Sequence, residues 1–256
     1  MAFTSEKEIG QLHNRLLDLA NQSYKQNVYK FSGFLGLAEL SVFAEMEKDL
    51  SFAHPVLFGG YDMAERQMIR FGDPVQFGYE EAFPITCIHV TPLIFKFAEE
   101  LSHRDFLGAL MNLGIERSCI GDIRTGEKEG YFFCQPQVAG YICENLSQIR
   151  HTHVKCEITD AEVKLPFAQP GEQDILVSSL RLDSCIAKLC NLSRSESLGM
   201  FATGKVFLNG RMTENNSRPL EKNDVVNVRG YGKFIFQEEK YTTKKGKRCL
   251  KFDTYT

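Results

Sequence analysis

The stretch Leu180–Phe236, LRLDSCIAKLCNLSRSESLGMFATGKVFLNGRMTENNSRPLEKNDVVNVRGYGKFIF, has the clearest local pattern in this chain of 256 residues. Its first apolar residues, within Leu182–Leu189, recur at spacings of three, one and three, which predicts a short helix with one buried side. Ser193 is followed three residues later by Glu196, the spacing of a capping box, so a second helix should begin near Arg194. The stretch therefore opens with two consecutive helices.

The second half of this stretch predicts a small sheet. Gly204 stands where the second helix should end, because glycine adopts the left-handed conformation of a helix terminus without steric cost. Alternating residues then lead into Asn209-Gly210, a dipeptide typical of tight β-hairpins. Another apolar run begins after Asp224, is interrupted by Gly230–Gly232, and then continues. The predicted order is helix, helix and three or four short strands.

Five short motifs in this stretch, by their order and spacing, resemble the S4-type RNA-binding domain. The motifs are Arg181-Leu182-Asp183, Ser193-Arg194, Gly204-Lys205-Val206, Asn209-Gly210 and, after Asp224, Val228-Arg229-Gly230-Tyr231-Gly232. The resemblance implies that the helical pair and the loops of the sheet present basic and polar side chains to RNA phosphates. By position, the resemblance marks Arg181, Arg194, Lys205, Arg229 and Lys233 as RNA-binding candidates. Ser193 and Tyr231, which stand within the same motifs, are two further candidates.

A phosphate-binding position at the start of the second helix also follows from the residues alone. Free backbone amides at a helix N-terminus favour an anion, and Arg194 places a guanidinium beside them, next to the Ser193 hydroxyl. The basic run Lys244–Arg248, with Lys245 near its middle, would similarly suit phosphate contact at the tip of a terminal hairpin. For each single cation the alternative is an ordinary solvated charge.

Charge is divided unevenly along the chain. The formal net charge is only −3, which by itself argues against binding to nucleic acid. From Ile175 onward, however, there are 15 Lys and Arg against 8 Asp and Glu, which leaves 15 against 25 for residues 1–174. The basic character therefore lies in the last third, and we expect the acidic remainder to orient the protein or to contact a protein partner.

The composition indicates a globular protein with real cores, since 43% of the residues are apolar. No run of about 18 apolar residues exists, and the first ten residues lack a signal-peptide pattern, so we expect a cytoplasmic protein without a membrane segment. We also expect the protein to be a monomer. The cysteines include no CxxC pair and should be buried free thiols in a reducing compartment. They are Cys87, Cys119, Cys134, Cys143, Cys156, Cys185, Cys190 and Cys249.

The rest of the chain predicts two further parts, which makes the expected fold class α+β. Residues 1–75 should form a mixed domain with helices near 5–27 and 36–50, a strand at 56–61 and a helix through 64–69. Two glycines that end the strand, in FGGYDMAER, could admit a phosphate. A simple turn is favoured, because neither GxGxxG nor a following Lys-Ser/Thr is present.

Residues 82–158 predict a domain with the order βαββαβ. Such a unit folds as a four-stranded antiparallel sheet with two helices on one face, the ferredoxin-like plan that RNA-recognition modules also use. Tyr131–Phe133 share one of its strands and could stack on bases, although the rest of that signature is absent. Residues 159–174, which contain proline and glycine, are expected to link this domain to a C-terminal domain at 175–256.

Two longer motifs extend the resemblance to nearly the whole chain. LFGGYDMAER at 57–66 and LSHRDFLGALMNLGIERSCIGDI at 101–123, together with the terminal S4-type stretch, resemble the bacterial YlmH family. The resemblance implies a factor that binds rRNA and tRNA on the large ribosomal subunit during quality control of stalled nascent chains. It implies no catalytic activity and no cofactor.

Three patterns that suggest an enzyme or a metal site are incomplete. His103–Asp105 matches a kinase HRD triplet, but Leu110 replaces the required asparagine and no DFG motif accompanies it. The triplet is instead expected to start a helix, with Arg104 available for an ion pair or for RNA. GMFATGK at 199–205 lacks the serine or threonine of a phosphate loop. The histidines before Cys156 would point away from it on a strand, so no metal site is expected.

Two other functions remain open from the sequence. S4-type domains also accompany pseudouridine synthases, so the chain could be an RNA-modifying enzyme with Asp105 as its acid, although the middle part is small for such a catalyst. The N-terminal two-thirds could instead be a protein-interaction platform for a partner in cell division or translation. Cosedimentation with ribosomal subunits, with and without nuclease, separates these hypotheses from a ribosome-bound RNA-binding protein.

Overall fold

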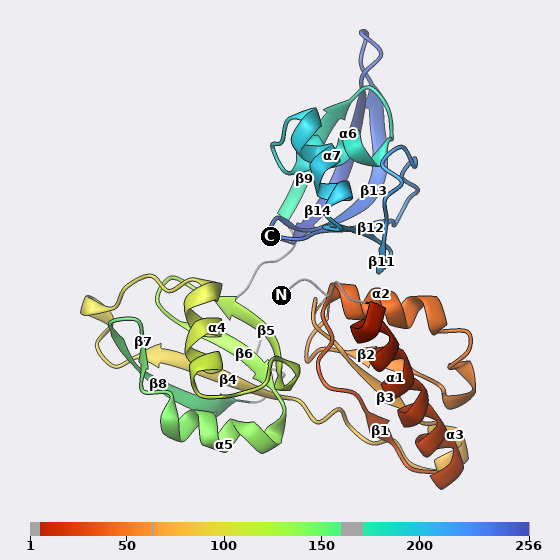
Figure 1. The fold of residues 1–256 in the computed structure, drawn as a ribbon. Coiled ribbons are helices and arrows are strands. Elements are labelled where there is room, and N and C mark those ends of the chain that lie inside the picture. The colour runs from red at the N-terminus through yellow and green to blue at the C-terminus, as the bar shows by residue number, and fades with distance from the viewer. Residues whose placement is uncertain (1–5, 63, 160–170, 256) are drawn as a thin grey trace. The chain divides into compact units, whose positions relative to one another are not determined.

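A computed structural model describes residues 6–62, 64–159 and 171–255. The chain divides into two units, Met1–Phe167 and Ala168–Thr256, and each forms its own core. Both units combine helices with antiparallel sheets, so the predicted α+β class is confirmed (Figure 1). Among the described residues, no helix is both long enough and apolar enough to cross a lipid bilayer.

The N-terminal part of the first unit packs helices against a three-stranded sheet. Its elements are α1 (Glu6–Gln26), β1 (Lys30–Phe31), α2 (Leu37–Met46), β2 (Val56–Phe58), β3 (Met68–Phe71) and the short α3 (Pro74–Phe77). The strands run antiparallel in the order β1-β3-β2. Leu16, Leu50 and Phe71 are fully buried in the core that the helices share with the sheet.

The prediction of a helix through 64–69 is wrong, because strand β3 begins at Met68. This strand is buried on both faces: Ile69 and Phe71 belong to the core beneath α1 and α2, whereas Met68 packs with Phe34 in a second apolar cluster. The central position of β3 in its sheet explains that burial. Burial on both faces removes the alternation of apolar and polar residues by which a strand is recognised in a sequence.

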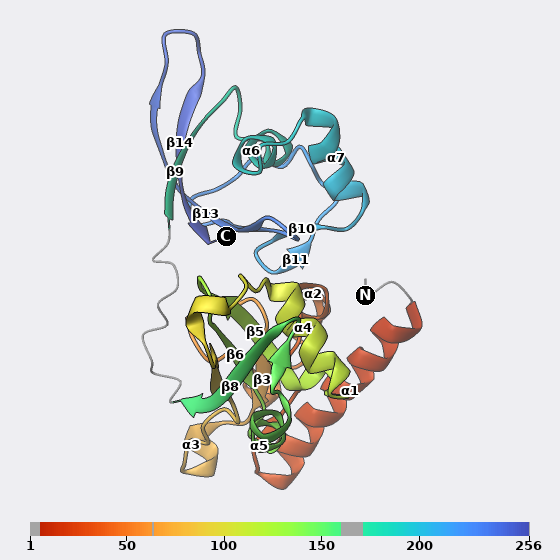
Figure 2. The same cartoon turned by 90° about the vertical axis from the view of Figure 1, so that its left-hand side faces the viewer.

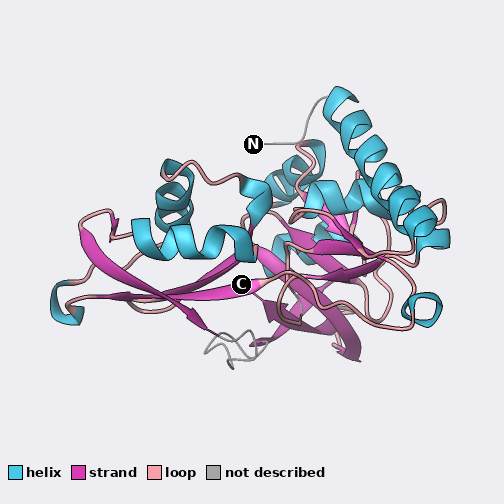
Figure 3. Cartoon of the chain, turned by 90° about the horizontal axis from the view of Figure 1, so that it is seen from below, coloured by secondary structure: helices cyan, strands magenta, loops and turns pink. Residues whose placement is uncertain are grey.

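The middle part of the first unit is a five-stranded antiparallel sheet with two helices on one face (Figure 3). Its elements are β4 (Thr86–Pro92), α4 (His103–Asn112), β5 (Ile120–Thr125), β6 (Gly130–Cys134), α5 (Pro136–Asn145), β7 (Gln148–Ile149) and β8 (Thr152–Thr159). The strand order is β5-β6-β4-β8-β7. Apart from β7, this order and these directions agree with the split β-α-β arrangement expected from the sequence.

The extra strand β7 changes the predicted end of the second helix. The sequence predicted a helix through Ile149, whereas α5 ends at Asn145. Arg150 adopts a φ of 53°, which turns the chain so that Ile149 pairs with Thr152 of β8. The apolar residues after Asn145 therefore belong to a turn and a short edge strand, and a fifth strand joins the predicted four.

The aromatic residues of β6 are not available for base stacking. Phe132 points into the core beneath α4 and α5, and Phe133 is fully buried on the opposite face, where the ring of Tyr61 stacks on it at 5.1 Å. Tyr131 is largely buried and stacks on His89, with ring centroids 4.1 Å apart. The expectation of base stacking on this strand is therefore wrong, because the N-terminal part of the same unit covers that face of the sheet.

The second unit contains one six-stranded antiparallel sheet and two helices. Its elements are β9 (Gly171–Val177), α6 (Leu182–Leu189), α7 (Arg194–Ala202), β10 (Val206–Leu208), β11 (Arg211–Met212), β12 (Val225–Val228), β13 (Gly232–Thr242) and β14 (Arg248–Tyr255). The strand order is β11-β10-β12-β13-β14-β9. Both helices pack on one face of this sheet through a single apolar core (Figure 2).

Local predictions in this unit agree well with its structure. Gly204 follows α7 with a φ of 61°, and Asn209 and Gly210 form the left-handed turn between β10 and β11. The predicted bounds of the linker, 159 and 174, are both wrong. Thr159 still belongs to β8, and β9 begins at Gly171 because it pairs with β14, a long-range contact with no local signal. Residues 160–170 of that linker lie outside the described residues.

Candidate nucleic-acid interface

The starts of α6 and α7 lie close together in the second unit. The Ser197 hydroxyl donates a 2.8 Å hydrogen bond to the carbonyl oxygen of Asp183, which joins the first turns of the two helices. The predicted capping box of α7 is present: the Glu196 amide donates to Ser193 Oγ at 3.2 Å, and the Ser193 amide donates to the Glu196 carboxylate at 2.8 Å. Ser193 is therefore engaged in capping, and Arg194 is the exposed cation that follows it.

Arg181 is committed to an ion pair inside the unit. Its Nε donates to Asp183 Oδ1 at 3.0 Å and its Nη2 to Oδ2 at 2.8 Å, and the Asp183 side chain is only 3% exposed. Hydrogen bonding to Arg181 lowers the pKa of Asp183, and the nearby charge of Arg194 adds to this shift. Arg181 thus stabilises the start of α6 and remains partly exposed beside Arg194.

Arg218 joins these cations, although the sequence did not mark it. Its carbonyl oxygen accepts a 2.9 Å hydrogen bond from the Leu182 amide, so its backbone lies at the start of α6, and its side chain is exposed. The loop that carries it has no motif, and only the fold brings it to the helix. We call Arg181, Arg194 and Arg218 the helix-start surface.

Lys205, Arg229 and Tyr231 form a second group, which we call the sheet-end surface. The Arg229 amide donates to the Lys205 carbonyl at 2.9 Å, and the Tyr231 amide donates to Val228 across the following turn at 2.9 Å. The Arg229 guanidinium covers the buried Phe207 ring at 5.9 Å from its centroid. Because Val206 and Val228 face the core, their neighbours Lys205 and Arg229 point to the sheet face away from the helices.

The structure therefore divides the predicted RNA-binding residues among several places. Helix α7 separates Arg194 from Lys205 by about 13 Å along its axis. Lys233 lies on β13 opposite Asn227, next to the sheet-end surface. Lys245 stands at the tip of the β13–β14 hairpin, roughly 30 Å from Lys233 along the strand. Arg104 belongs to the first unit, where it is exposed on α4.

The two long motifs of the first unit meet at the buried carboxylate of Asp122, which is 8% exposed. The Tyr61 hydroxyl donates to Asp122 Oδ2 at 2.6 Å, the Glu65 amide to Oδ2 at 2.7 Å, and the Arg66 amide to Oδ1 at 2.9 Å. The Arg66 guanidinium in turn donates to the carbonyls of Ile120 and Phe34 at 3.0 and 2.8 Å. These motifs therefore fasten the N-terminal part of the unit to its larger sheet.

Arg117 strengthens the same junction. Its guanidinium donates to the carbonyl oxygens of Ile120 and Gly121 at 2.6 and 3.2 Å. Burial, together with the charge of Arg66, lowers the pKa of Arg117 to about 10, so it stays protonated at neutral pH. Gly60 of the FGG turn has a φ of 101°, and a Cβ there would lie 2.4 Å from the Phe133 ring, so the two glycines serve close packing.

Residues that could support catalysis or metal binding have structural roles. Asp105 closes a capping box on α4, since its carboxylate accepts from the Ser102 amide at 2.9 Å and from the Ser102 hydroxyl at 2.6 Å. Cys156 lies in the core of the larger sheet, and burial raises the pKa of its thiol to about 12. Within the described ranges, no group of three or more His, Cys, Asp and Glu could hold a metal ion, and all eight cysteines are free.

The chain is similar to known RNA-binding and ribosome-associated proteins. Residues 79–163, which include the whole larger sheet of the first unit, match the family model described as "Putative RNA-binding domain in YlmH". The chain is 29% identical over 199 residues to "Ribosome-associated protein quality control protein P2" of Bacillus subtilis (strain 168), across 76% of each protein. Its sequence is therefore similar to that of a ribosome-associated quality control protein, and its residues 79–163 match a domain described for YlmH.

A solved structure is also similar to this chain. "Cell division protein ylmH from Streptococcus pneumoniae" covers 62% of this chain with 95% of its own length, at 15% sequence identity and a TM-score of 0.46.

Replacing Asp183 by Asn is expected to lower the unfolding free energy by about 1–3 kcal/mol at pH 7, because a buried acceptor for Arg181 and for the Ser184 amide loses its charge. The pKa of Asp183 is lower in the folded protein, so its stabilisation is present above the unfolded value of about 3.9 and is lost as pH falls through the folded value. Urea unfolding at several pH values measures this.

The difference between the wild type and D183N should therefore shrink as the pH is lowered below about 4. Glu214→Gln is the matched control, because it removes the same charge from an exposed position in the same unit. Equal midpoints for D183N and E214Q at neutral pH would contradict the stabilising role of the Arg181–Asp183 pair.

Proposed function

We propose that this protein is a non-enzymatic RNA-binding factor that acts on the large ribosomal subunit. Its ligands would be rRNA and tRNA, and its role would be the quality control of stalled nascent chains in the cytoplasm. The B. subtilis relative, which is named as a ribosome-associated quality control protein, supports the ribosomal part. The matched family domain supports RNA as the ligand.

The helix-start surface is the observation that carries this proposal within the second unit. Three arginines are carried by two adjoining helix starts and the loop beside them, where the helix dipole also favours an anion. Arginine is suited to phosphate because its planar guanidinium can donate two parallel hydrogen bonds. The αα pair packed on a small sheet is consistent with an S4-type domain, whose helical pair would present these side chains to RNA phosphates.

The first unit would supply the remaining contacts. Its larger sheet is consistent with a ferredoxin-like RNA-binding domain, in which the exposed Arg104 would contact RNA. The first unit, residues 1–167, has 15 Lys and Arg against 23 Asp and Glu, and this acidic balance would keep much of it away from phosphate and leave it free to contact a protein partner. Phosphate contacts would dominate affinity and would carry little base preference.

Cosedimentation with purified ribosomal subunits tests the proposal. The full chain should pellet with the large subunit at low salt and should stay in the supernatant with the small subunit. Digestion of the rRNA by nuclease before mixing should abolish pelleting. Unchanged pelleting after digestion would show that ribosomal proteins are the ligand, and no pelleting at low salt would remove the ribosomal role altogether.

A further inference from the structure

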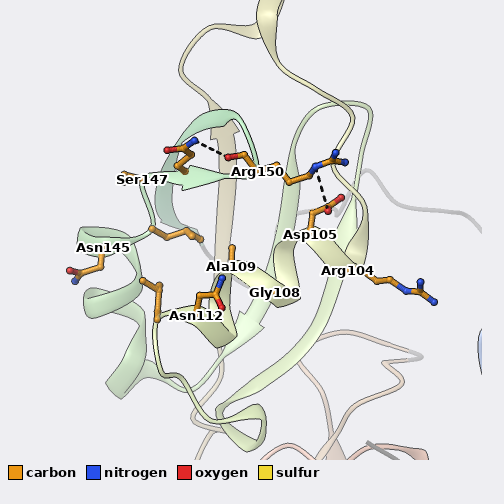
Figure 4. Close-up of a pocket in the computed structure, with 11 residues that line it drawn as sticks. Arg104, Asp105, Gly108, Ala109, Asn112, Asn145, Ser147 and Arg150 are labelled. Carbon is orange, nitrogen blue, oxygen red and sulfur yellow. Dashed lines mark hydrogen bonds and ion pairs between the residues drawn. The ribbon is translucent and has the colours of Figure 1, made fainter.

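A groove of about 630 Å³ runs beside α4 in the first unit (Figure 4). One wall carries Arg104, Gly108 and Asn112, which are spaced four apart and therefore lie along one side of the helix. The other wall is the segment from Asn145 to Arg150, which includes Ser147. The groove is lined by guanidinium, carboxamide and hydroxyl groups, by the Asp105 carboxylate and by apolar side chains such as Leu113, and its volume is in the range of ligand-binding pockets.

Gly108 keeps the floor of this groove open. A glycine inside a helix is less favourable than an alanine, but it leaves the helix backbone uncovered by a side chain. Apart from its chain neighbours and its own helix backbone, no atom of the described residues lies within 4 Å of the position that a Cβ of Gly108 would occupy. Packing therefore leaves the helix backbone at Gly108 open, and a ligand in the groove could approach it closely.

At the cationic end of the groove, the Arg150 guanidinium is not hydrogen-bonded to the nearby carboxylates. Arg150 lies 3.9 Å from Asp105 and 4.0 Å from Glu99, distances at which it is attracted but not hydrogen-bonded to either carboxylate. Asp105 already accepts two hydrogen bonds from Ser102. For Arg104, the described part of the chain shows no ion pair. The Arg150 guanidinium can therefore donate to an anionic ligand, whereas the Arg104 side chain points away from Arg150 and lies at the edge of the groove (Figure 4).

An exposed apolar segment continues this surface beyond Arg150. A smaller hollow of about 240 Å³ is lined by Ile94, Phe97 and the residues at 151–153 that directly follow Arg150. Phe97 is 75% exposed, and Lys128 covers the neighbouring Phe95 ring at 5.1 Å from its centroid. Exposed aromatic rings beside cations are the features on which unpaired bases stack.

We propose that the groove beside α4 binds the sugar-phosphate backbone of single-stranded RNA and that Phe97 stacks on a base of the same strand. Arg150 would hold a phosphate, Arg104 would add positive charge at the edge of the groove, Asn112 would hydrogen-bond to the adjoining sugar, and Gly108 would let the RNA backbone approach the helix. A strand that followed this path would continue past 151–153 to the aromatic segment. The site lies within the matched domain at 79–163, and it rests on the proposed RNA-binding function.

Two glycine variants test the groove, because both replace a helical glycine by glutamate and therefore change net charge and helix propensity equally. Gly108→Glu fills the floor with an anionic side chain. Gly140→Glu makes the same change on α5, outside the groove, where a Cβ also meets no described atom within 4 Å beyond its own helix and chain neighbours. Binding of a fluorescein-labelled single-stranded RNA to the full chain would be followed by anisotropy. G108E should bind about tenfold more weakly, as for the loss of one hydrogen bond to a charged group, and G140E should match the wild type.

Two variants of Phe97 distinguish RNA stacking from apolar contact with a protein. Phe97→Tyr keeps an aromatic ring, whereas Phe97→Leu keeps apolar area without one. If the ligand is a stacked base, F97Y should bind RNA as the wild type does and F97L should lose about tenfold in affinity. Equal RNA affinity for F97L and the wild type would overturn the stacking role and would favour a protein as the occupant of this segment.

RNA binding and ribosome binding by these variants distinguish failure of the groove proposal from failure of the proposed function on which it rests. G108E should still pellet with the large subunit, because the basic second unit is intact. Wild-type affinity of G108E for the RNA, or equal losses in G108E and G140E, would overturn the groove and leave the ribosomal role standing. Failure of the wild type to bind both the labelled RNA and the ribosome would instead overturn the proposed function. Thermal unfolding of both glycine variants checks that neither has lost its fold.

Discussion

Replacing Asp122 by Ala is expected to lower the unfolding free energy of the first unit by about 3–5 kcal/mol. The substitution leaves the Tyr61 hydroxyl and the amides of Glu65 and Arg66 without their buried acceptor. It also removes the carboxylate that faces two partly buried guanidiniums, those of Arg66 and Arg117. Domains of this size are stable by only about 5–15 kcal/mol, so urea or thermal unfolding would show the effect clearly.

Two further substitutions calibrate this expectation. Tyr61→Phe removes one of the three hydrogen bonds and keeps the ring that stacks on Phe133, so a loss of about 1 kcal/mol is expected. Asp18→Ala removes an exposed carboxylate from α1 and should change stability by less than about 0.5 kcal/mol. If D122A unfolded at the same denaturant concentration as D18A, the two motifs would not be fastened through this carboxylate.

Removing two cations from the helix-start surface is expected to cost the largest share of ribosome affinity. In the double variant Arg194→Ala and Arg218→Ala, we expect at least about a hundredfold weaker binding to purified large subunits, since hydrogen bonds to charged groups contribute about 1.5–3 kcal/mol each. Arg181 is left in place because its pair with Asp183 stabilises α6. Quantitative cosedimentation at fixed salt measures the change.

A second double variant compares the two basic surfaces of this unit. Lys205→Ala with Arg229→Met removes the same charge from the sheet-end surface, and methionine keeps the apolar stem that covers Phe207. We expect about a tenfold loss here, because these cations do not lie at a helix start and no helix dipole adds to their attraction for phosphate. Lys25→Ala with Lys48→Ala, both exposed in the first unit, is the control for net charge. Equal losses in all three would mean that only overall charge matters.

Local signals in the sequence were enough to predict much of the second unit. The Ser193 capping box, Gly204 and the Asn209-Gly210 turn each act within a few residues, and each is found where expected. Strand β9 has no such signal, because it is defined by pairing with β14 about 80 residues later. The linker was therefore predicted to extend too far.

The residues of the candidate sites also differ in whether a local sequence signal or only the fold determines their position. Arg194 could be predicted because its position relative to Ser193 fixes it at the start of a helix. Arg218 could not, because only the fold brings its loop to α6. The role of Asp122 depends on contacts with residues 56 to 61 positions away, and the groove beside Gly108 depends on the turn at Arg150. Long-range contacts of this kind leave no trace in the spacing of a single sequence.

The salt dependence of binding to purified large subunits is the most direct test of a phosphate-binding second unit. If about five phosphates are neutralised, the logarithm of the association constant should fall against the logarithm of salt concentration with a slope of roughly −3.5 to −4.5. The slope should become shallower by about 1.4–1.8 when Arg194 and Arg218 are both replaced. A slope near zero for the wild type, or an unchanged slope in that variant, would contradict the account.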